Sequence, residues 1–563
     1  MISNSAPCLD AAARWWAQLL GVTTETIPLG NGLAVLIAGS FQGRPRYVAQ
    51  TGGRKLLGIG TFFSDRGFGV QSLDGIDPGV RAEDLVSSLY GHYVLVAESE
   101  DAVKVIPDPL GMIDVFWATH HSGEHFCISN SMLSVARATC RYQLDRFGVL
   151  EFLAREATVG TDTLFAGVAR LRLGAHLVVS PRGIVSAPLH SYVRPDFFDL
   201  ESYQMAVSGY FTALLSLHRV TAVELSAGFD TRTVLACTSR HARSPVFAIT
   251  NDNLADRGVD CHIGSLLAQR LGIEHTVARV SPHAPDGLDR LLFILDAGRD
   301  IFRSRRWCGI AQAVYASADL LLGGYGGEVL RDKHTGYGGW EGFCRGYYGK
   351  DGVLAPLGVA EELSAHLTNR LRDLYVNPWL RTADEVDRWL YACDRMRIWG
   401  GVRVRSRLFW GDSLHPFMDW RLLGPLIFAP SATLADGRFQ YQLIAACQPS
   451  LLDFPINPSA ESLGRNNEGG AGVSLRVRKH LSKWRRGGLR LAGKLGLAVS
   501  DFERLAVSCE VFGRVESETG VSLRDLQLCK RESGGLMGRF VTVVLAAQLS
   551  QHGTLPTTSP FVR

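Results

Sequence analysis

VELSAGFDTRTVLA, residues 223–236, joins a short β-branched apolar run to a stretch with helical spacing. The apolar run is typical of a buried strand, and the later apolar residues are typical of one face of a helix. The connection therefore predicts a tight turn at the end of a strand, directly before a helix. It consists largely of small and polar residues, namely Ser226, Ala227, Gly228, Asp230, Thr231 and Arg232.

The alternation of strands and helices extends to both sides of this turn. Apolar β-branched runs predict strands at 220–225, 244–250, 273–280 and 318–324, and amphipathic stretches predict helices at 200–217, 231–240 and 257–272. Such alternation is typical of βαβ units, which build a parallel sheet. Beyond about residue 355 the pattern predicts a mostly helical chain.

The first 195 or so residues follow another pattern. Short alternating or β-branched segments, broken by Gly, Pro, Asp and Asn, predict strands within 33–41, 92–99, 103–108, 125–131 and 176–183. Helices are predicted at 132–139 and 146–156. This region is predicted to be a layered α+β domain, so we place the domain boundary between 1–197 and 198–563.

The composition is that of an ordinary soluble protein. A formal charge of +4 over 563 residues does not favour nucleic-acid binding. The 11 cysteines form no CxxC pair, and no His/Cys group has the spacing of a zinc motif, so reduced thiols are expected. The N-terminus lacks secretory features, and the most apolar run, 540–549, is too short to span a bilayer and predicts a buried helix. We expect a cytoplasmic protein.

The turn at 226–232 is a candidate anion site. Ligands of open parallel sheets bind at the carboxyl ends of the strands, where the amides of a small-residue turn and of the next helix attract anions. Asp230 would repel a phosphate unless a divalent cation lay between them. Ser226, Thr231 and Arg232 add donors for phosphate oxygens. The alternative is an ordinary strand–turn–helix connection in which Asp230 caps the helix.

A second phosphate-loop candidate has a weaker pattern. The stretch GLRLAGKL, 488–495, approaches the Walker-type loop, but Leu495 occupies the position of the hydroxyl residue that binds Mg²⁺. It also follows a basic segment rather than a strand. We interpret it as a chance match.

The stretch LSAGFDTR resembles the SGGxDS loop of the asparagine synthetase family of ATP-pyrophosphatases, with Ala227 replacing a Gly and Thr231 replacing a Ser. Further stretches resemble family segments in the same order along the chain: 108–118, 126–131, 163–177, 256–275, 321–332 and 411–419. The resemblance implies a glutaminase-like sandwich domain of the Ntn-hydrolase type over 1–197. It implies an α/β synthetase domain like the adenine-nucleotide α-hydrolases, with a helical C-terminal part, over 198–563.

The resemblance also implies the ligands and the residues that bind them. ATP and Mg²⁺ would be bound, with Asp230 and Glu328 as the metal ligands. Glu328 stands where the family has a second Asp. The residues assigned to ATP and pyrophosphate are Leu225, Ser226, Ala227, Gly228, Asp230, Thr231, Arg232, Ile249 and Gly324.

One departure from the family concerns the nitrogen donor. Glutamine-using members need a Cys as the mature N-terminal residue, because its free amine acts as the base. Here the chain starts Met1-Ile2-Ser3, and the nearest thiol is Cys8. Unless processing exposes Cys8, the first domain resembles the inactive N-terminal domains of β-lactam synthetases and lasso peptide macrocyclases. In those relatives the attacking amine belongs to the substrate, so we expect no glutaminase activity.

A second departure lies in the loop GGYGGE, where Tyr325 replaces a family Glu. β-lactam synthetases have a Tyr at this position, paired with an acid, to deprotonate the attacking amine. By that match Tyr325 is a candidate base and Asp412 its partner acid. The alternative is a buried loop aromatic with a satisfied hydroxyl.

Near the C-terminus, the segment 454–470 lacks the catalytic Lys of β-lactam synthetases and reads as a loop or lid. The basic stretch 476–494 is interpreted as a solvated helix face, or as a surface for an acidic peptide, pyrophosphate or a partner protein.

These features favour a lasso peptide cyclase. It would adenylate an Asp or Glu side chain of a linear core peptide and join it to the peptide's N-terminal amine, with a leader peptidase as partner protein. A β-lactam synthetase, an ammonia-dependent asparagine synthetase and a non-catalytic biosynthetic scaffold remain alternatives. The cluster of Asp230, Tyr325 and Glu328 argues against the scaffold, because a dead domain has no reason to keep polar groups together.

Overall fold

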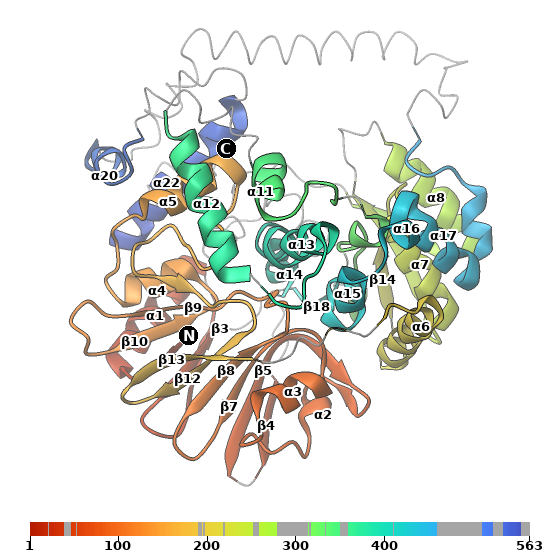
Figure 1. The fold of residues 1–563 in the computed structure, drawn as a ribbon. Helices are drawn as coiled ribbons and strands as arrows, with labels where there is room; N and C mark the ends of the chain where they lie inside the picture. The colour runs from red at the N-terminus through yellow and green to blue at the C-terminus, as the bar shows by residue number, and fades with distance from the viewer. Residues whose placement is uncertain are drawn as a thin grey trace.

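The computed structural model contains two antiparallel sheets, one parallel sheet and many helices (Figure 1). It describes residues 1–20, 22–38, 47–51, 53–189, 194, 197–217, 220–251, 258–278, 314, 317–332, 334–348, 358–375, 377–408, 410–458, 509–521 and 533–552. The stretch 488–495, the basic stretch 476–494 and most of 454–470 lie outside these ranges.

The N-terminal region is a sandwich of two antiparallel sheets. The first has the order β11-β9-β10-β1-β3-β2, and the second has the order β13-β12-β8-β7-β5-β4 with β6 beside β5. Their strands are β1 (Ile2–Ser3), β2 (Thr24–Pro28), β3 (Ala34–Ala38), β4 (Tyr47–Thr51), β5 (Arg54–Ser64), β6 (Gly67–Phe68), β7 (Tyr90–Glu98), β8 (Val103–Pro107), β9 (Phe116–Thr119), β10 (Phe126–Ser129), β11 (Ala169–Arg170), β12 (Ala175–Ser180) and β13 (Gly183–Pro188).

Helices cover both outer faces of this sandwich. Val35 and Ile128 of the first sheet share a buried apolar core with Val96 and Leu177 of the second. Helices α1 (Ala6–Leu20) and α4 (Met132–Ala138) pack on the first sheet, and α2 (Val70–Leu73) and α3 (Ala82–Ser88) on the second. The result is a stack of four layers, helix–sheet–sheet–helix, with α5 (Arg146–Arg155) beside it.

The second region is built on the five-stranded parallel sheet. Its order is β16-β15-β14-β17-β18, formed by β14 (Thr221–Glu224), β15 (Val246–Asn251), β16 (Glu274–Ala278), β17 (Leu320–Leu322) and β18 (Asp412–Leu414). Helix α7 (Phe229–His241) packs on β14, and α8 (Val259–Leu271) packs on β15 and β16. Helix α6 (Leu200–Ser216) packs on α7.

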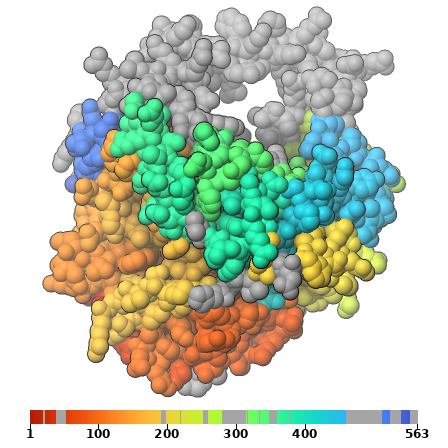
Figure 2. All heavy atoms as spheres, in the orientation of Figure 1, coloured from red at the N-terminus to blue at the C-terminus, as the bar shows by residue number. Residues whose placement is uncertain are grey.

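The rest of the described chain is largely helical. Its elements are η1 (Val329–Arg331), α11 (Trp340–Phe343), the π-helix η2 (Cys344–Tyr348), α12 (Ala360–Tyr375), α13 (Ala383–Leu390), the π-helix η5 (Tyr391–Gly400), α14 (Gly401–Arg407), η6 (Pro416–Met418), α15 (Trp420–Ile427), α16 (Ser431–Leu434), η7 (Ala435–Gly437), α17 (Arg438–Cys447), η8 (Pro449–Asp453), α20 (Cys509–Thr519) and α22 (Ser533–His552). Figure 2 shows the green residues of this part between the orange N-terminal region and the blue α16–α17 segment.

Buried arginines on η5 and α14 join the two regions. Arg397 donates to the backbone carbonyl of Leu171 at 2.8 Å, and Arg405 pairs with the buried Asp114 at 3.1 Å. Arg170 pairs with the same carboxylate at 3.3 Å. Removing one member of such a buried set would leave an uncompensated charge, which costs about 3–5 kcal/mol. The helices that overlie the parallel sheet are therefore held firmly against the sandwich.

The last helix returns to the N-terminal region. α22 packs on α4 and α5, and Arg539 donates to the carbonyl of Leu153 at 2.6 Å and pairs with Glu156 at 2.9 Å. Within the described ranges, none of the helices combines the length and apolarity that crossing a membrane demands.

The coarse expectations from the sequence are confirmed. The strand-rich first part forms antiparallel sheets, and the alternating part forms a parallel sheet. The helices predicted at 132–139, 146–156 and 200–217 are α4, α5 and α6, and the apolar run 540–549 lies in the buried helix α22. The boundary at 197/198 stays a prediction, since α20 and α22 lie against α5 of the first region.

Candidate functional site

The strand order of the parallel sheet fixes where a ligand would bind. β14 is the first strand of this sheet along the chain and lies at its centre. The chain moves outward on one side through β15 and β16, then continues on the other side with β17 and β18. Ligands of open α/β sheets bind where the order reverses, outside the carboxyl ends of the strands. Here that place lies beyond β14 and β17, where the turn 225–228 and the loop 323–328 begin.

The turn after β14 is closed by polar side chains. The amide of Ser226 donates to Oγ1 of Thr231 at 3.0 Å, and the amide of Gly228 donates to Oγ of Ser226 at 3.2 Å. The amide of Ala227 donates to Oδ1 of Asp260, near the start of α8, at 2.8 Å. Three successive amides of the predicted turn thus point at oxygen atoms, and one of these oxygens belongs to a carboxylate. The arrangement is suited to anions.

Leu225 and Ile249 anchor this turn to the sheet. The amide of Leu225 donates to the carbonyl of Ile249 at 2.8 Å, and both side chains are buried. The two residues lie side by side at the carboxyl ends of β14 and β15, which is where the sequence resemblance expects contacts with the nucleotide.

The loop after β17 lies directly against the first turn of α7. A Cβ added at Gly324 would lie 2.6 Å from the amide nitrogen of Thr231, and one at Gly327 would lie 2.7 Å from Oδ1 of Asp230. Atoms this close would clash, so only glycine permits the two loops to meet. This contact explains the glycines of GGYGGE and brings Glu328 toward Asp230.

The two acids predicted to bind a metal interact with each other. Burial and then the charge of Asp230 raise the pKa of Glu328 above its usual range. Asp230 is held by Gln440, whose Nε2 donates to Oδ1 at 2.9 Å, and by Arg331, which pairs with Oδ2 at 2.7 Å. Two carboxylates from facing loops are oxygen ligands of the kind that Mg²⁺ prefers. The donor set fits this ion, and Arg331 supplies the balancing positive charge here.

Arg232 differs from the expectation that it donates to phosphate. Its side chain is fully buried, and its guanidinium donates to the carbonyls of Leu451 at 3.1 Å, Phe454 at 2.7 Å and Pro455 at 2.8 Å. Burial lowers its pKa to about 10. Arg232 therefore ties α7 to the segment after α17. The sequence could not show this, because these carbonyls lie more than two hundred positions away.

Tyr325 lies in the second loop and is nearly buried. Its hydroxyl donates to the carbonyl of Met396 on the π-helix η5 at 3.0 Å. The guanidinium of Arg403 lies 5.1 Å from the centre of its ring. A Cβ at Gly400 would overlap the Tyr325 hydroxyl, so the glycine at the end of η5 makes room for it. π-Helical turns are frequent at functional sites.

Asp412 does not take the position expected of a partner acid. It starts β18 and pairs in register with Leu320, five residues before Tyr325. Its Oδ1 accepts from Oγ1 of Thr61 in the N-terminal sandwich at 3.3 Å. Because parallel strands run the same way, this register sets Asp412 toward the amino ends of the strands and Tyr325 beyond their carboxyl ends.

His415, which the sequence reasoning missed, lies beside Tyr325 instead. It follows the carboxyl end of β18, and its ring stands edge-on to the Tyr325 ring with centroids 5.7 Å apart. Burial and then the charge of Arg407 lower the pKa of His415 well below its usual range, so the imidazole is neutral. Arg407 also forms a buried ion pair with Glu224. The sequence offered no signal for it, because the pattern beyond residue 355 predicted helices and not the strand β18 that His415 follows.

Comparisons with known proteins add no family assignment. A scan against protein-family models and a search of curated protein sequences each found no match to this chain.

Proposed function

We propose that this chain is an ATP-dependent, AMP-forming ligase of the asparagine synthetase type, and that it acts as a lasso peptide cyclase. One observation carries the proposal: the turn 225–228 and the loop 323–328 meet at the strand-order reversal of the parallel sheet. There, three successive backbone amides point at polar oxygens, and the charge of Asp230 acts on the second acid, Glu328. An anion site beside a carboxylate pair suits a nucleoside triphosphate.

The first half-reaction would form an acyl-adenylate. A carboxylate of the substrate attacks the α-phosphorus of ATP, and pyrophosphate leaves. The amides of Ser226, Ala227 and Gly228 would hold the departing pyrophosphate in place of their present acceptors. Asp230 and Glu328 would hold Mg²⁺, which offsets negative charge on the phosphates when it is bound.

The second half-reaction would form the amide. An amine of the same substrate attacks the acyl carbon, and AMP leaves. Tyr325 would give up its bond to Met396, pass its own hydroxyl proton to a further base and take up the amine proton. The neutral His415 beside its ring would position it. Folding one substrate so that its amine meets its own carbonyl makes this step intramolecular, which supplies much of the rate.

The choice of an amine within the substrate rests on Tyr325. In the β-lactam synthetases that this loop resembles, a Tyr at this position helps to deprotonate an amine of the substrate, so the amine would come from the substrate rather than from glutamine. The four layers of the N-terminal region fit the glutaminase-like Ntn fold that the resemblance implies. A β-lactam synthetase fits the same site and remains the second candidate, because Tyr325 matches it. The missing Lys in 454–470 favours the cyclase.

The test is exchange of labelled pyrophosphate into ATP by the full chain, with a linear core peptide that carries an internal Asp or Glu. We expect labelled pyrophosphate to exchange into ATP only when both the peptide and Mg²⁺ are present. The amount of AMP released should equal the amount of peptide whose mass has fallen by one water. A matched peptide with Asn or Gln at that position should support neither. Exchange with a small carboxylated amino acid but not with the peptide would favour the β-lactam alternative. No exchange with either substrate class would favour the scaffold.

A further inference from the structure

Two segments of the N-terminal region meet at its surface, away from the parallel sheet. One is the turn between β9 and β10, which is closed by bonds from the amide of His120 to the carbonyl of His125 at 2.8 Å and from the amide of Gly123 to the carbonyl of His120 at 2.9 Å. The other follows α4 and contains Cys140. Nε of Arg141 donates to the carbonyl of Thr119 at 3.1 Å, which ties the two segments together.

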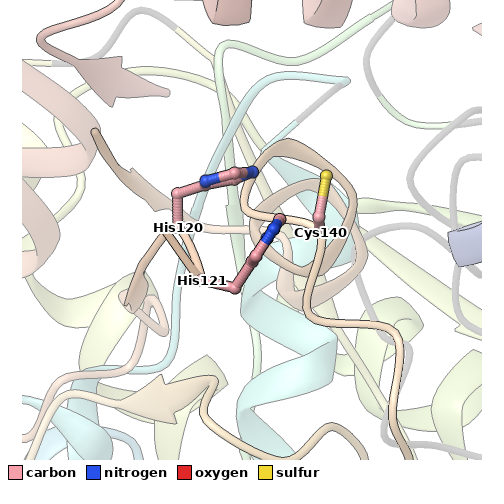
Figure 3. Close-up of side chains that lie close together, drawn as sticks. All are labelled: His120, His121 and Cys140. Atoms are coloured by element: carbon pink, nitrogen blue, oxygen red, sulfur yellow. The ribbon is translucent and has the colours of Figure 1, made fainter. Parts of the chain in front are cut away.

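Side chains of the kind that bind transition metals converge there. The candidate ligand atoms of His120, His121 and Cys140 all lie within 4.8 Å of one another. Figure 3 shows both imidazoles gathered beside the sulfur of Cys140. The ring centroids of His120 and His121 are 4.0 Å apart, and those of His120 and His125 are 4.3 Å apart. The edges of a tetrahedral zinc site are about 3.3–3.8 Å, from its bond lengths, so small rotamer changes would complete it.

We infer that His120, His121 and Cys140 form a binding site for a zinc-type divalent transition-metal ion. Nitrogen and sulfur donors suit such an ion and not Mg²⁺, which separates this site from the acid pair at the parallel sheet. With three side chains supplied, the fourth position is open to water or to Glu124 or His125, which both lie near His120.

Neighbouring groups already orient the ligands. Nδ1 of His120 accepts from the amide of Ser122 at 3.2 Å and lies 2.7 Å from Oγ of Ser122, which fixes the orientation of the ring. Metal binding at Nε2 would move the ring proton to Nδ1, where Oγ of Ser122 can accept it. Nε2 of His125 lies 3.1 Å from the carbonyl of Ala138. The hydroxyl of Tyr142 donates to the sulfur of Cys140 at 3.6 Å, which helps to hold the sulfur in place.

The backbone and the charges also bear on the site. Cys140 has φ 54°, a left-handed conformation that is uncommon for a residue with a side chain and that sets the direction of its sulfur. The charge of Arg141 opposes a cation, and the negative charge of a Cys140 thiolate offsets it.

The sequence hides this site because its ligands are far apart. Two adjacent histidines followed by a cysteine twenty positions later match no zinc motif. Only the pairing of β9 with β10, and the contact of α4 with both strands, brings them together.

The experiment uses the full chain, freed of metal with a chelator and titrated with Co²⁺ and then Zn²⁺. We expect one equivalent of Co²⁺ to give the visible bands of a tetrahedral site and a thiolate charge-transfer band in the near ultraviolet, and Zn²⁺ to displace it. Cys140→Ser should abolish the charge-transfer band. Loss of an outer-shell partner of a metal ligand typically weakens metal affinity by roughly 10- to 100-fold. Cys140→Ser and His121→Gln each remove a ligand itself, so each should weaken Co²⁺ affinity by more than that. Tyr142→Phe, which removes such a partner, should fall within that range.

Cys261→Ser is the matched control, because Cys261 lies on α8 outside the cluster, and it should bind Co²⁺ like the parent. Cys140 and His121 are exposed, so small polar substitutions at these positions leave core packing unchanged. Circular dichroism checks that the variants are folded. Binding that keeps its thiolate band in Cys140→Ser, or a parent that binds no Co²⁺ at micromolar concentration, would overturn the inference.

Discussion

Arg331 occupies both carboxylate oxygens of Asp230, with Nε 3.1 Å from Oδ1 and a terminal nitrogen 2.7 Å from Oδ2. Such a two-point contact is the strong form of an arginine–carboxylate pair. It means that a divalent cation and Arg331 would compete for the same two oxygens. The acid predicted from the sequence to bind metal is therefore already charge-balanced within the chain.

Asp230→Asn should abolish AMP formation and pyrophosphate exchange while leaving the fold intact. The amide keeps the shape and a hydrogen bond acceptor for Gln440, but it removes the charge that a cation requires. Activity is read from AMP release, and folding from circular dichroism. Asp373→Asn, at an exposed position on α12, is the control and should behave like the parent. An Asp230→Asn enzyme of parental rate would rule out the metal role.

Arg331→Gln should lower the Mg²⁺ concentration needed for half-maximal exchange. The substitution releases Asp230 from its competitor, and the added repulsion with Glu328 favours a bound cation. The measurement is the Mg²⁺ dependence of pyrophosphate exchange. Arg372→Gln removes a similar but exposed pair with Glu341 and should leave that dependence unchanged. A higher Mg²⁺ requirement in Arg331→Gln would show that Arg331 assists rather than competes.

Tyr325→Phe should separate the two half-reactions. Without the hydroxyl, adenylation should proceed while amide formation slows by about 10²- to 10⁴-fold, the usual cost of losing a general base. The product should then be AMP with hydrolysed linear peptide, measured by mass spectrometry. His415→Gln should show a milder split, because its ring contacts that of Tyr325.

Asp412→Asn serves as the comparison for Tyr325→Phe. Its register beside Leu320 predicts no selective effect on the second half-reaction. If Asp412→Asn by itself slowed amide formation while leaving adenylation intact, Asp412 would act on Tyr325 in a rearranged site. If Tyr325→Phe cyclised peptide at the parental rate, the base would have to be another group.

Glu224→Gln should destabilise the fold by about 3–5 kcal/mol, because it leaves the buried guanidinium of Arg407 without its counter-charge. The side chain of Arg407 is 1% exposed and that of Glu224 is 15% exposed. The free energy of unfolding is obtained from denaturant titration. The exposed pair of Arg146 and Glu362 is the control, and Glu362→Gln should leave the midpoint nearly unchanged. Equal effects of the two substitutions would contradict the buried pair's importance.

The stability that His366 contributes should fall as the pH rises from about 6.5 to about 9. Hydrogen bonds that His366 donates to Asp162 and then to Glu151 raise its pKa to about 9, with Arg370 beside Asp162. The folded state therefore binds this proton more tightly than the unfolded chain. The resulting stability is complete below about pH 6.5 and is lost as the pH approaches 9. Burial raises the pKa of Glu151 from 4.5 to about 7, so its effect on stability falls between about pH 4.5 and 7, mostly below this range.

The measurement is the free energy of unfolding across this pH range for the parent and for His366→Gln, whose curve should be flatter. His241→Gln is the control. Burial lowers the pKa of His241, so it is neutral in both states above about pH 6.5 and should not alter the slope. If the free energy of unfolding of His366→Gln changed with pH as steeply as that of the parent, another group would be responsible for the pH dependence.

Patterns among neighbouring residues predicted the helices, the strands and the turn at 226–232, but not the contacts between distant segments. The strand at 220–225 and the turn with Asp230 were readable because periodicity and small residues are local signals. Arg232 looked like a ligand because its neighbours are polar, whereas its partners come from the segment after α17. Asp412 and His415 lie three residues apart, and only the register of β18 decides which of them approaches Tyr325. Strand register is set by packing, which a single sequence does not reveal.

The return of α22 to the N-terminal region has a consequence for how the protein is made. α5 emerges from the ribosome long before its apolar covering, α22, is made. Residues 156–532 must be translated in between, which takes roughly 20 to 75 s at about 5–20 residues per second. During that interval the nascent first region carries an uncovered apolar face, the kind of surface that chaperones recognise. Its folding can be completed only after α22 has also been translated.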